Sequence, residues 1–301
     1  MSNHLALVGI SKHYSKRRAL DNISAIIPKG ARVGLVGPNG AGKTTLMSII
    51  AGLIPNHSGS LTWGETRDLR YAPQDPIFPR RINCHDLLRY YGRLEGLSGN
   101  LLEQEVRRVL DSVSMWDART LASHALSHGM RKRLCIAQSL LCSRPLILLD
   151  EPTAGLDPVN AERVRNAVIA KGPGQTIIIS SHNLDEIQSC CDYVMILADG
   201  ELMHFGPMSE FTSKSDTIEV VFGTSVDAHQ LEALAGLPHI TSISPGKDMK
   251  AVSVVVPSTE QATVMSAILQ WGQDNKLVIE SLRKGVSLTA RFLEKTQKKR
   301  R

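Results

Sequence analysis

The amino-acid sequence predicts an α/β fold with a largely parallel sheet, followed by a smaller α+β domain. Short apolar runs bounded by Gly or Pro alternate with helical periodicity from Leu5 to about Gly206, the pattern of α/β domains. No strand pattern occurs between Arg80 and Leu126, and the order of elements changes after Ser213. A chain of 301 residues, of which 42% are hydrophobic, can bury the cores of two such domains.

Each strand predicted for the first domain is a short apolar run. The clearest is Leu146–Leu149, whose four apolar residues indicate a strand buried on both faces of a parallel sheet. In chain order the predicted strands are Leu5–Ile10, Ala19–Ile27, Ala31–Val36, Arg70–Ala72, Leu146–Asp150, Thr176–Ser180, Tyr193–Ala198 and Glu201–Phe205.

A helical insertion interrupts this series of strands. The stretches "CHDLLRYYGRLEGL" and "LLEQEVRRVLDSVSMW" have the periodicity of amphipathic helices. We therefore predict a helical subdomain at about residues 78–128, within a first domain that spans residues 1–212.

The small second domain is predicted to span residues 213–301. Its order of strand, helix, strand, strand, helix, strand is the ferredoxin-like, or split βαβ, order. A short last helix, Val286–Lys295, and the basic tail "KTQKKRR" follow. The sequence leaves open whether this domain binds a regulatory ligand, helps two subunits to dimerise or is a passive spacer. The tail is either a solvated terminus or a segment for an anionic membrane surface. The predicted elements are Thr217–Phe222, Val226–Leu237, Ile240–Ser244, Lys250–Val256, Thr259–Gln273 and Lys276–Leu282.

Composition narrows the class of protein. The longest apolar run, "LMSIIAGLI", is much shorter than the roughly 18 residues of a membrane-spanning helix, and residues 1–10 do not resemble a signal peptide. The five cysteines form no CxxC pair, so we expect reduced thiols in a soluble intracellular protein. Only 4% of residues are aromatic, and no basic face interleaved with aromatics occurs, so nucleic acid is not an expected partner.

A phosphate-binding loop is predicted in "GLVGPNGAGKTTLMSII". Gly37, Gly42, Lys43 and Thr44 have the G-x-x-x-x-G-K-[ST] spacing, after an apolar strand and before an apolar helix. Backbone amides of such a loop surround the β-phosphate, and the helix N-terminus adds its dipole. Lys43 would contact the β- and γ-phosphates, and the Thr44 hydroxyl can ligate Mg²⁺.

Two acidic residues complete the chemistry that such a loop requires. Asp150 and Glu151 stand at the carboxyl end of the buried strand in "RPLILLDEPTAGLDP", where ligands of open α/β sheets bind. Asp150 would hold Mg²⁺ through water, and Glu151 would act as the general base on the attacking water.

From about Leu5 to Phe205 the chain resembles an ATP-binding cassette (ABC) ATPase, a P-loop fold with a helical subdomain. The resemblance implies that Tyr14 in "KHYSKRRAL" stacks on adenine, although it could be a surface aromatic. It also implies that Gln74 in "RYAPQDPIFP" is the Q-loop glutamine, that Asp157 in "AGLDP" belongs to the D-loop and that His182 in "IIISSHNLDEI" is the switch histidine. The catalytic residues would be Glu151, His182 and Lys43, and the Mg²⁺ ligands Thr44, Gln74 and Asp150. The ATP-binding residues would be Tyr14, Gly37, Pro38, Asn39, Gly40, Ala41, Gly42, Lys43, Thr44 and Thr45.

The family's signature sequence, LSGGQ, corresponds here to "LSHGM", in which His128 and Met130 depart from the pattern. By resemblance, Ser127, His128 and Gly129 cover the γ-phosphate of ATP held by a second cassette, and Ser127 caps a helix. We expect His128 to be tolerated, because Lys43 and the other catalytic residues are all present.

Three cations, Arg131, Lys132 and Arg133, occupy the first part of this helix, where they oppose its dipole. Our interpretation is that nucleotide on the opposite subunit compensates them while they stay partly solvated. The alternative is a solvated surface with no ligand.

The resemblance extends to the ATPase subunits of exporters of drugs, lipids, polysaccharides or ions. It implies ATP and Mg²⁺ as ligands, a second cassette, expected to be an identical copy, and an integral membrane permease as partners. The location would be cytoplasmic, at the inner face of the membrane. The alternatives are a soluble ABC ATPase that acts on ribosomes or DNA and an inactive scaffold cassette.

Overall fold

The structure is a computed structural model, and it describes residues 3–15, 17–170, 174–212, 217–246, 248–257 and 259–285. The chain forms two compact units, Met1–Gly206 and Pro207–Arg301, so the short helix α7 (Met208–Thr212) groups with the second unit and not, as predicted, with the first. All five cysteines are free thiols. None of the helices in the described part of the chain has the length and hydrophobicity that a membrane span needs.

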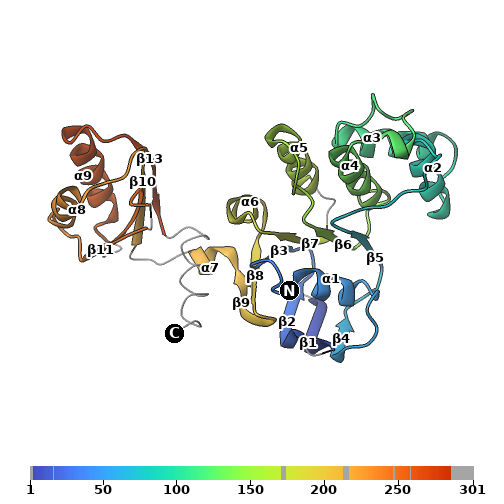
Figure 1. The fold of residues 1–301 in the computed structure, drawn as a ribbon, viewed down its shortest axis with the longest axis horizontal. Coiled ribbons are helices and arrows are strands. Elements are labelled where there is room, and N and C mark those ends of the chain that lie inside the picture. The colour runs from blue at the N-terminus through green and yellow to red at the C-terminus, as the bar shows by residue number, and fades with distance from the viewer. Residues whose placement is uncertain are drawn as a thin grey trace. The chain divides into compact units, whose positions relative to one another are not determined.

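A six-stranded sheet with the order β5-β6-β7-β3-β8-β9 forms the centre of the first unit (Figure 1). Strands β5, β6, β7, β3 and β8 pair in parallel, which confirms the predicted α/β class. Every residue of β6 and β7 is buried, as their apolar runs require. The bounds are β3 (Arg32–Val36), β5 (Leu69–Ala72), β6 (Leu146–Asp150), β7 (Thr176–Ser181), β8 (Tyr193–Ala198) and β9 (Glu201–Pro207).

The first two predicted strands do not join this sheet. They are β1 (Asn3–Tyr14) and β2 (Arg17–Pro28), which form a separate antiparallel sheet with β4 (Ser58–Trp63). We did not predict β4, because its sequence, "SGSLTW", leaves most side chains exposed and lacks an apolar run. The expectation of one sheet was therefore incomplete.

Helix α1 (Lys43–Ile50) lies between the two sheets (Figure 1). Its apolar side chains join those of β1, β2 and β3 in one hydrophobic core, which fixes the start of the helix close to both sheets. On the other face of the parallel sheet lie α5 (Pro158–Ile169) and α6 (Leu184–Cys190). A Cβ atom on Gly34 would be 2.1 Å from Ile187 Cγ2, so α6 packs directly on the backbone of β3.

The interval between β5 and β6 is helical, as predicted. Its elements are α2 (Cys84–Leu94), α3 (Gly99–Ser112), the 3₁₀ turn η1 (Ser123–Ala125) and α4 (His128–Ser139). Their buried residues recur on one face of each helix, as the amphipathic sequence pattern indicated.

The second unit has a four-stranded antiparallel sheet with the order β11-β12-β10-β13. Its chain order of strand, helix, strand, strand, helix, strand is the one expected from the sequence. The inward side chains of β10 and β12 pack with α8 and α9 in a core of their own. The predicted helix Val286–Lys295 and the basic tail lie outside the described residues. The bounds are β10 (Thr217–Phe222), α8 (Ala228–Ala235), β11 (Ser242–Pro245), β12 (Ala251–Val255), α9 (Gln261–Asp274) and β13 (Ile279–Lys284).

Candidate active site

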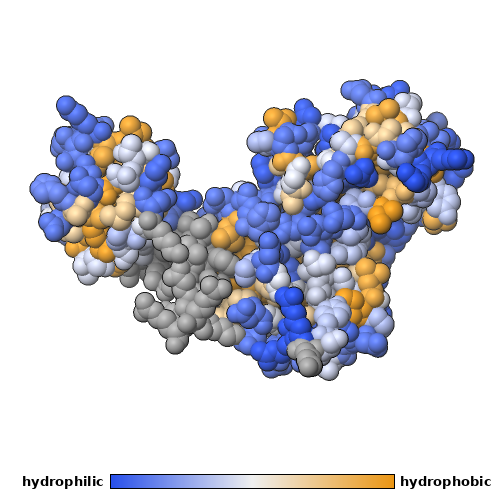
Figure 2. Space-filling view, viewed as in Figure 1, coloured by the Kyte–Doolittle hydropathy of each residue, from blue (hydrophilic) through white to orange (hydrophobic). Residues whose placement is uncertain are grey.

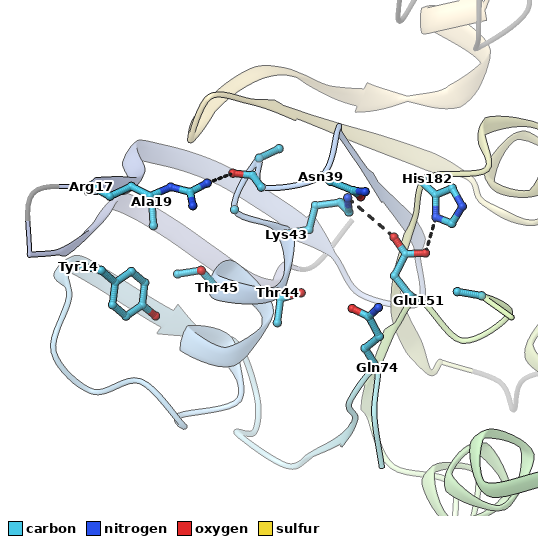
Figure 3. A pocket seen from close by; sticks show the side chains of 14 residues that line it. Tyr14, Arg17, Ala19, Asn39, Lys43, Thr44, Thr45, Gln74, Glu151 and His182 are labelled. Carbon is cyan, nitrogen blue, oxygen red and sulfur yellow. Dashed lines mark hydrogen bonds and ion pairs between the residues drawn. The ribbon is translucent and has the colours of Figure 1, made fainter. Parts of the chain in front are cut away.

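A cavity of about 890 Å³ lies at the carboxyl ends of the parallel strands. Figure 3 shows Tyr14 at one end of it, Glu151 and His182 at the other, and the phosphate loop between them. Its size is that of a typical small-molecule site. The lining residues are Tyr14, Arg17, Ala19, Asn39, Gly40, Ala41, Gly42, Lys43, Thr44, Thr45, Gln74, Glu151, Ala154 and His182.

The strand order brings these distant residues together. Gln74 follows β5, Glu151 follows β6, His182 follows β7 and the phosphate loop follows β3. Because β5, β6, β7 and β3 are successive neighbours in parallel register, their carboxyl ends form one row. Ligands of open α/β sheets bind at such an edge.

The phosphate loop ends at Gly42, the N-cap of α1, whose φ of 103° an L side chain rarely adopts. A Cβ atom there would also be 2.6 Å from the Ala19 carbonyl oxygen. No side chain caps α1, so its first amides are available to an anion in the cavity.

Lys43 is buried, and its Nζ donates to the Gly37 carbonyl at 2.7 Å and the Pro38 carbonyl at 3.4 Å. Gly37 and Pro38 do not line the cavity themselves. Their carbonyls instead hold the lysine at its edge, within reach of a phosphate that enters the loop.

Glu151 lies between two basic groups. Its Oε1 is 3.8 Å from Lys43 Nζ, and its Oε2 is 2.8 Å from His182 Nδ1 (Figure 3). The Glu151 side chain is 9% exposed and that of His182 is 63% exposed. A buried carboxylate held beside a cation and an open imidazole suits proton transfer from a water molecule in the cavity.

The backbone at Glu151 is unusual. Its φ of 49° lies in the left-handed region, which is uncommon for a residue other than glycine. The Glu151 N–H donates to Ser180, to its carbonyl at 3.2 Å and its hydroxyl at 2.9 Å. These bonds hold the conformation that turns the carboxylate toward the cavity.

Of the expected magnesium ligands, Thr44 and Gln74 line the cavity, whereas Asp150 does not. Asp150 is 1% exposed and accepts hydrogen bonds from the hydroxyls of Ser180 and Tyr71. Burial, and secondarily the charge of Asp150, raises the pKa of Tyr71 to about 12. The two lining side chains fit a phosphate-bound Mg²⁺, and Asp150 lies behind the cavity wall, held by Ser180 and Tyr71.

The other end of the cavity contains a residue that we did not identify from the sequence. Arg17 lies opposite Tyr14 across the β1–β2 hairpin and lines the cavity with it. Its Nη2 is 3.4 Å from the Gly40 carbonyl oxygen. The separation of three positions between Tyr14 and Arg17 could have indicated that they pair across a hairpin.

The signature residues lie away from this cavity. Ser127 is the N-cap of α4, as predicted, and its hydroxyl accepts from the Met130 N–H at 3.2 Å. His128 is exposed, and Gly129 packs near Leu156. None of the three lines this cavity.

Asp157 is also outside the cavity. It is exposed and serves as the N-cap of α5, where its carboxylate accepts from the backbone N–H and side-chain amide of Asn160. The hydrogen bonds from Asn160 lower the pKa of Asp157.

The structure corrects our expectation for one of the three cations, Lys132, whereas Arg131 and Arg133 are partly exposed, as expected. Lys132 is 4% exposed and donates to the Glu151 carbonyl at 2.9 Å and the Ala154 carbonyl at 2.7 Å. It was expected to stay partly solvated, but the loop after β6 covers it. Arg131 donates to the Leu126 carbonyl, and Arg133 to two carbonyls at the end of α3, those of Val113 and Ser114. Carbonyls of the same chain therefore compensate these cations.

Comparison with known proteins identifies the family. The sequence profile of ABC transporters matches residues 20–154. The linearmycin resistance ATP-binding protein LnrL of Bacillus subtilis is 30% identical over 248 residues, which are 78% of this chain and 80% of LnrL. The chain belongs to the ABC transporter family.

Other relatives extend this likeness. The lantibiotic transport ATP-binding protein SrtF of Streptococcus pyogenes is 32% identical, over 74% of this ABC protein and 97% of SrtF. The ABC transporter ATP-binding protein YxlF of Bacillus subtilis is 30% identical over 97% of the chain and 96% of its own length, so its similarity includes the second unit. A solved ATP-binding subunit of an ABC transporter has a TM-score of 0.63 and 25% identity, over 69% of this chain and 91% of that one. The protein is an ABC transporter ATP-binding subunit, and it is an ATPase.

Proposed function

We propose that this ABC ATPase is one of two cassettes that close head to tail around two ATP molecules and drive a separate membrane permease. The position of the signature residues carries this proposal. Ser127 and His128 are exposed and lie outside the cavity that contains Lys43 and Glu151. A site that needs both groups of residues is complete only when a second cassette, in the simplest case another copy, supplies the signature.

Within each site, the side chains have distinct tasks. Adenine stacks on Tyr14, the amides at the start of α1 bind the phosphates, and Lys43 leaves the Gly37 carbonyl to contact the β- and γ-phosphates. Thr44 and Gln74 would hold Mg²⁺ directly and Asp150 would hold it through water. The bound ion would supply positive charge against the phosphates.

Glu151 acts as the general base in this proposal. Its carboxylate takes the proton of the attacking water as the oxygen of that water bonds to the γ-phosphorus, while the bond from the γ-phosphorus to the bridging oxygen breaks and ADP leaves. His182, held at 2.8 Å from that carboxylate, orients it and contacts the γ-phosphate. Asp157 at the start of α5 faces the second cassette in the closed dimer.

The helical subdomain is the proposed contact with the permease. Large apolar side chains are exposed on and before α2 and α3, and exposed apolar side chains that gather in one patch mark interaction sites. Ile77 is 94% exposed and follows Gln74 by three residues, so one segment links this surface to the nucleotide. Figure 2 shows hydrophobic patches over this region of helices. Besides Ile77, the exposed large apolar side chains of this surface are Tyr90, Leu94 and Leu101.

Such a partner would place the protein at the inner face of the cell membrane. The direction of transport is proposed from the relatives, because their names refer to lantibiotic transport and linearmycin resistance. Export of antimicrobial compounds is therefore the favoured activity of the complex.

The decisive experiment measures oligomeric state and partner together. Light scattering of the full chain carrying Glu151→Gln should give a dimer with ATP and a monomer without it. Co-purification from membranes should recover an integral membrane protein. A monomer at saturating ATP, or stimulation of ATP hydrolysis by RNA or DNA and not by a membrane protein, would overturn the proposal.

A further inference from the structure

Lys132 lies at the junction of three functional segments, the signature helix, the Q-loop and the loop after β6. It is the fifth residue of α4, the helix that begins with the signature, and it is almost fully buried. The charges that act on it most are the carboxylates of Asp75, Glu151 and Asp150, which follow β5 and end β6. The cation thus faces the Q-loop and the catalytic loop from the signature helix.

Its hydrogen bonds are made to the catalytic loop and not to the nucleotide cavity. The ammonium group donates to the carbonyls of Glu151 and Ala154, three residues apart, and so closes one turn of the loop. Lys132 is absent from the lining of the cavity. Whatever it contributes to hydrolysis must therefore act through the loop.

The loop also packs on the first turn of the same helix. A Cβ atom on Gly129 would lie 3.1 Å from Leu156 Cδ2, and one on Gly155 would lie 3.7 Å from the ring of His128. The loop of residues 151–156 therefore packs against the first turn of α4. Lys132 donates hydrogen bonds across this contact.

Both backbone polar groups of Glu151, the N–H and the carbonyl, are hydrogen-bonded. Its N–H is bonded to Ser180 of β7, and its carbonyl to Lys132 of α4. Because φ at Glu151 is 49°, this backbone needs its neighbours to hold it. On the opposite side of the loop, Thr153 donates to the buried Glu186 of α6 at 2.8 Å.

We propose that Lys132 is a positioning residue that couples the signature helix to the general base of its own chain. Displacement of α4, which in this proposal contacts nucleotide on the opposite cassette, would move the turn from Glu151 to Ala154 through two hydrogen bonds, one of them to the Glu151 carbonyl. The occupancy of one composite site would thereby set the geometry of the base in the other. This inference rests on the proposed roles of Glu151 and of the signature.

The test compares Lys132→Met with Arg133→Met in the full-length protein. Arg133 is the matched control, because it is the next cation of α4 and also donates to two carbonyls, but those belong to the end of α3. We expect K132M to bind ATP as the wild type does and to lower kcat by about 10- to 100-fold, since small displacements of a base cost that much. R133M should keep most of the wild-type kcat. Lys132→Arg should have a kcat closer to that of the wild type than K132M has.

Amide hydrogen exchange gives a readout that does not depend on hydrolysis. K132M should increase exchange at residues 152–156, and R133M should not. If K132M does not fold, Lys132→Gln, which is shorter but keeps N–H donors, should show a smaller loss of the same kind. Wild-type exchange and kcat in K132M, or an equal loss in R133M, would overturn the inference. Unchanged hydrolysis in Glu151→Gln would instead overturn the proposed base, and the exchange data would still decide the role of Lys132.

Discussion

His182 Nδ1 lies 2.8 Å from Glu151 Oε2, although the two residues follow different strands and are 31 positions apart in the chain. The contact exists because β6 and β7 are parallel neighbours with Asp150 opposite Ser180, so the residues after them emerge side by side. The second carboxylate oxygen of Glu151 faces Lys43. One side chain therefore connects the phosphate loop to the end of β7.

Replacing Glu151 with Gln should separate binding from hydrolysis. The amide keeps the size of the side chain but cannot accept a proton, so we expect phosphate release to fall by about 10²- to 10⁴-fold while ATP affinity is retained. Glu162→Gln, an exposed acid on α5, is the control and should hydrolyse normally. Wild-type turnover in E151Q would show that another group is the base.

Substitutions at Gly129 should affect hydrolysis only through the dimer. Gly129→Asp adds a negative charge where the second nucleotide is proposed to bind, and we expect little hydrolysis with ATP binding to the monomer intact. Gly129→Ala is the steric control, because both variants place a Cβ atom 3.1 Å from the flexible end of Leu156. If G129D hydrolyses ATP as fast as G129A, this helix does not face nucleotide.

His128→Gly restores the glycine of the family signature. The His128 ring is exposed and lies near the backbone of Gly155. Its loss should therefore leave folding unchanged. We expect ATPase activity close to that of the wild type. A large gain of activity in steady-state assays would instead mean that His128 obstructs the site.

Tyr14 should contribute to nucleotide affinity through its ring. Loss of base stacking in Tyr14→Ala is expected to cost about 1–3 kcal/mol, as for other aromatic platforms, which corresponds to a rise in Kd of roughly 5- to 150-fold. Tyr14→Phe should bind normally, and His13→Ala, on the neighbouring exposed position, is the control. Titration with ATP by calorimetry measures all three. An unchanged Kd for Y14A would make Tyr14 a surface aromatic.

Gly34 tests the packing of α6 on β3. A methyl group at this position would meet Ile187 Cγ2 at 2.1 Å, so Gly34→Ala should lower the free energy of unfolding by about 1–3 kcal/mol. Urea denaturation measures the change. In the Ile187→Ala background the cost of G34A should nearly vanish, because the two residues share one contact. Additive losses would contradict this packing.

Local sequence patterns predicted most elements of the fold. Apolar runs located β3, β6, β7 and β8, because strands buried on both faces need no tertiary information to be recognised. The same criterion could not find β4, a strand with mostly exposed side chains. Nor could it separate β1 and β2 from the parallel sheet, because the partner of a strand is chosen by long-range pairing.

The candidate site divides in the same way. Of the residues predicted from local features, Lys43, Thr44 and Glu151 line the cavity, since a phosphate loop and an acidic strand end can be recognised within a short stretch of sequence. Arg17 was not predicted, because its place in the cavity depends on the hairpin that sets it opposite Tyr14.

The sequence by itself determined the class of fold, the phosphate loop and the acidic strand end, because each depends on residues close together in the chain. Only the tertiary structure decided which groups the cations of "RKR", residues 131–133, contact. A helix dipole is a local property, and from it we expected Lys132 to be partly solvated and compensated by nucleotide. The carbonyls of Glu151 and Ala154, about twenty residues away in the chain, lie against α4 and accept its hydrogen bonds instead.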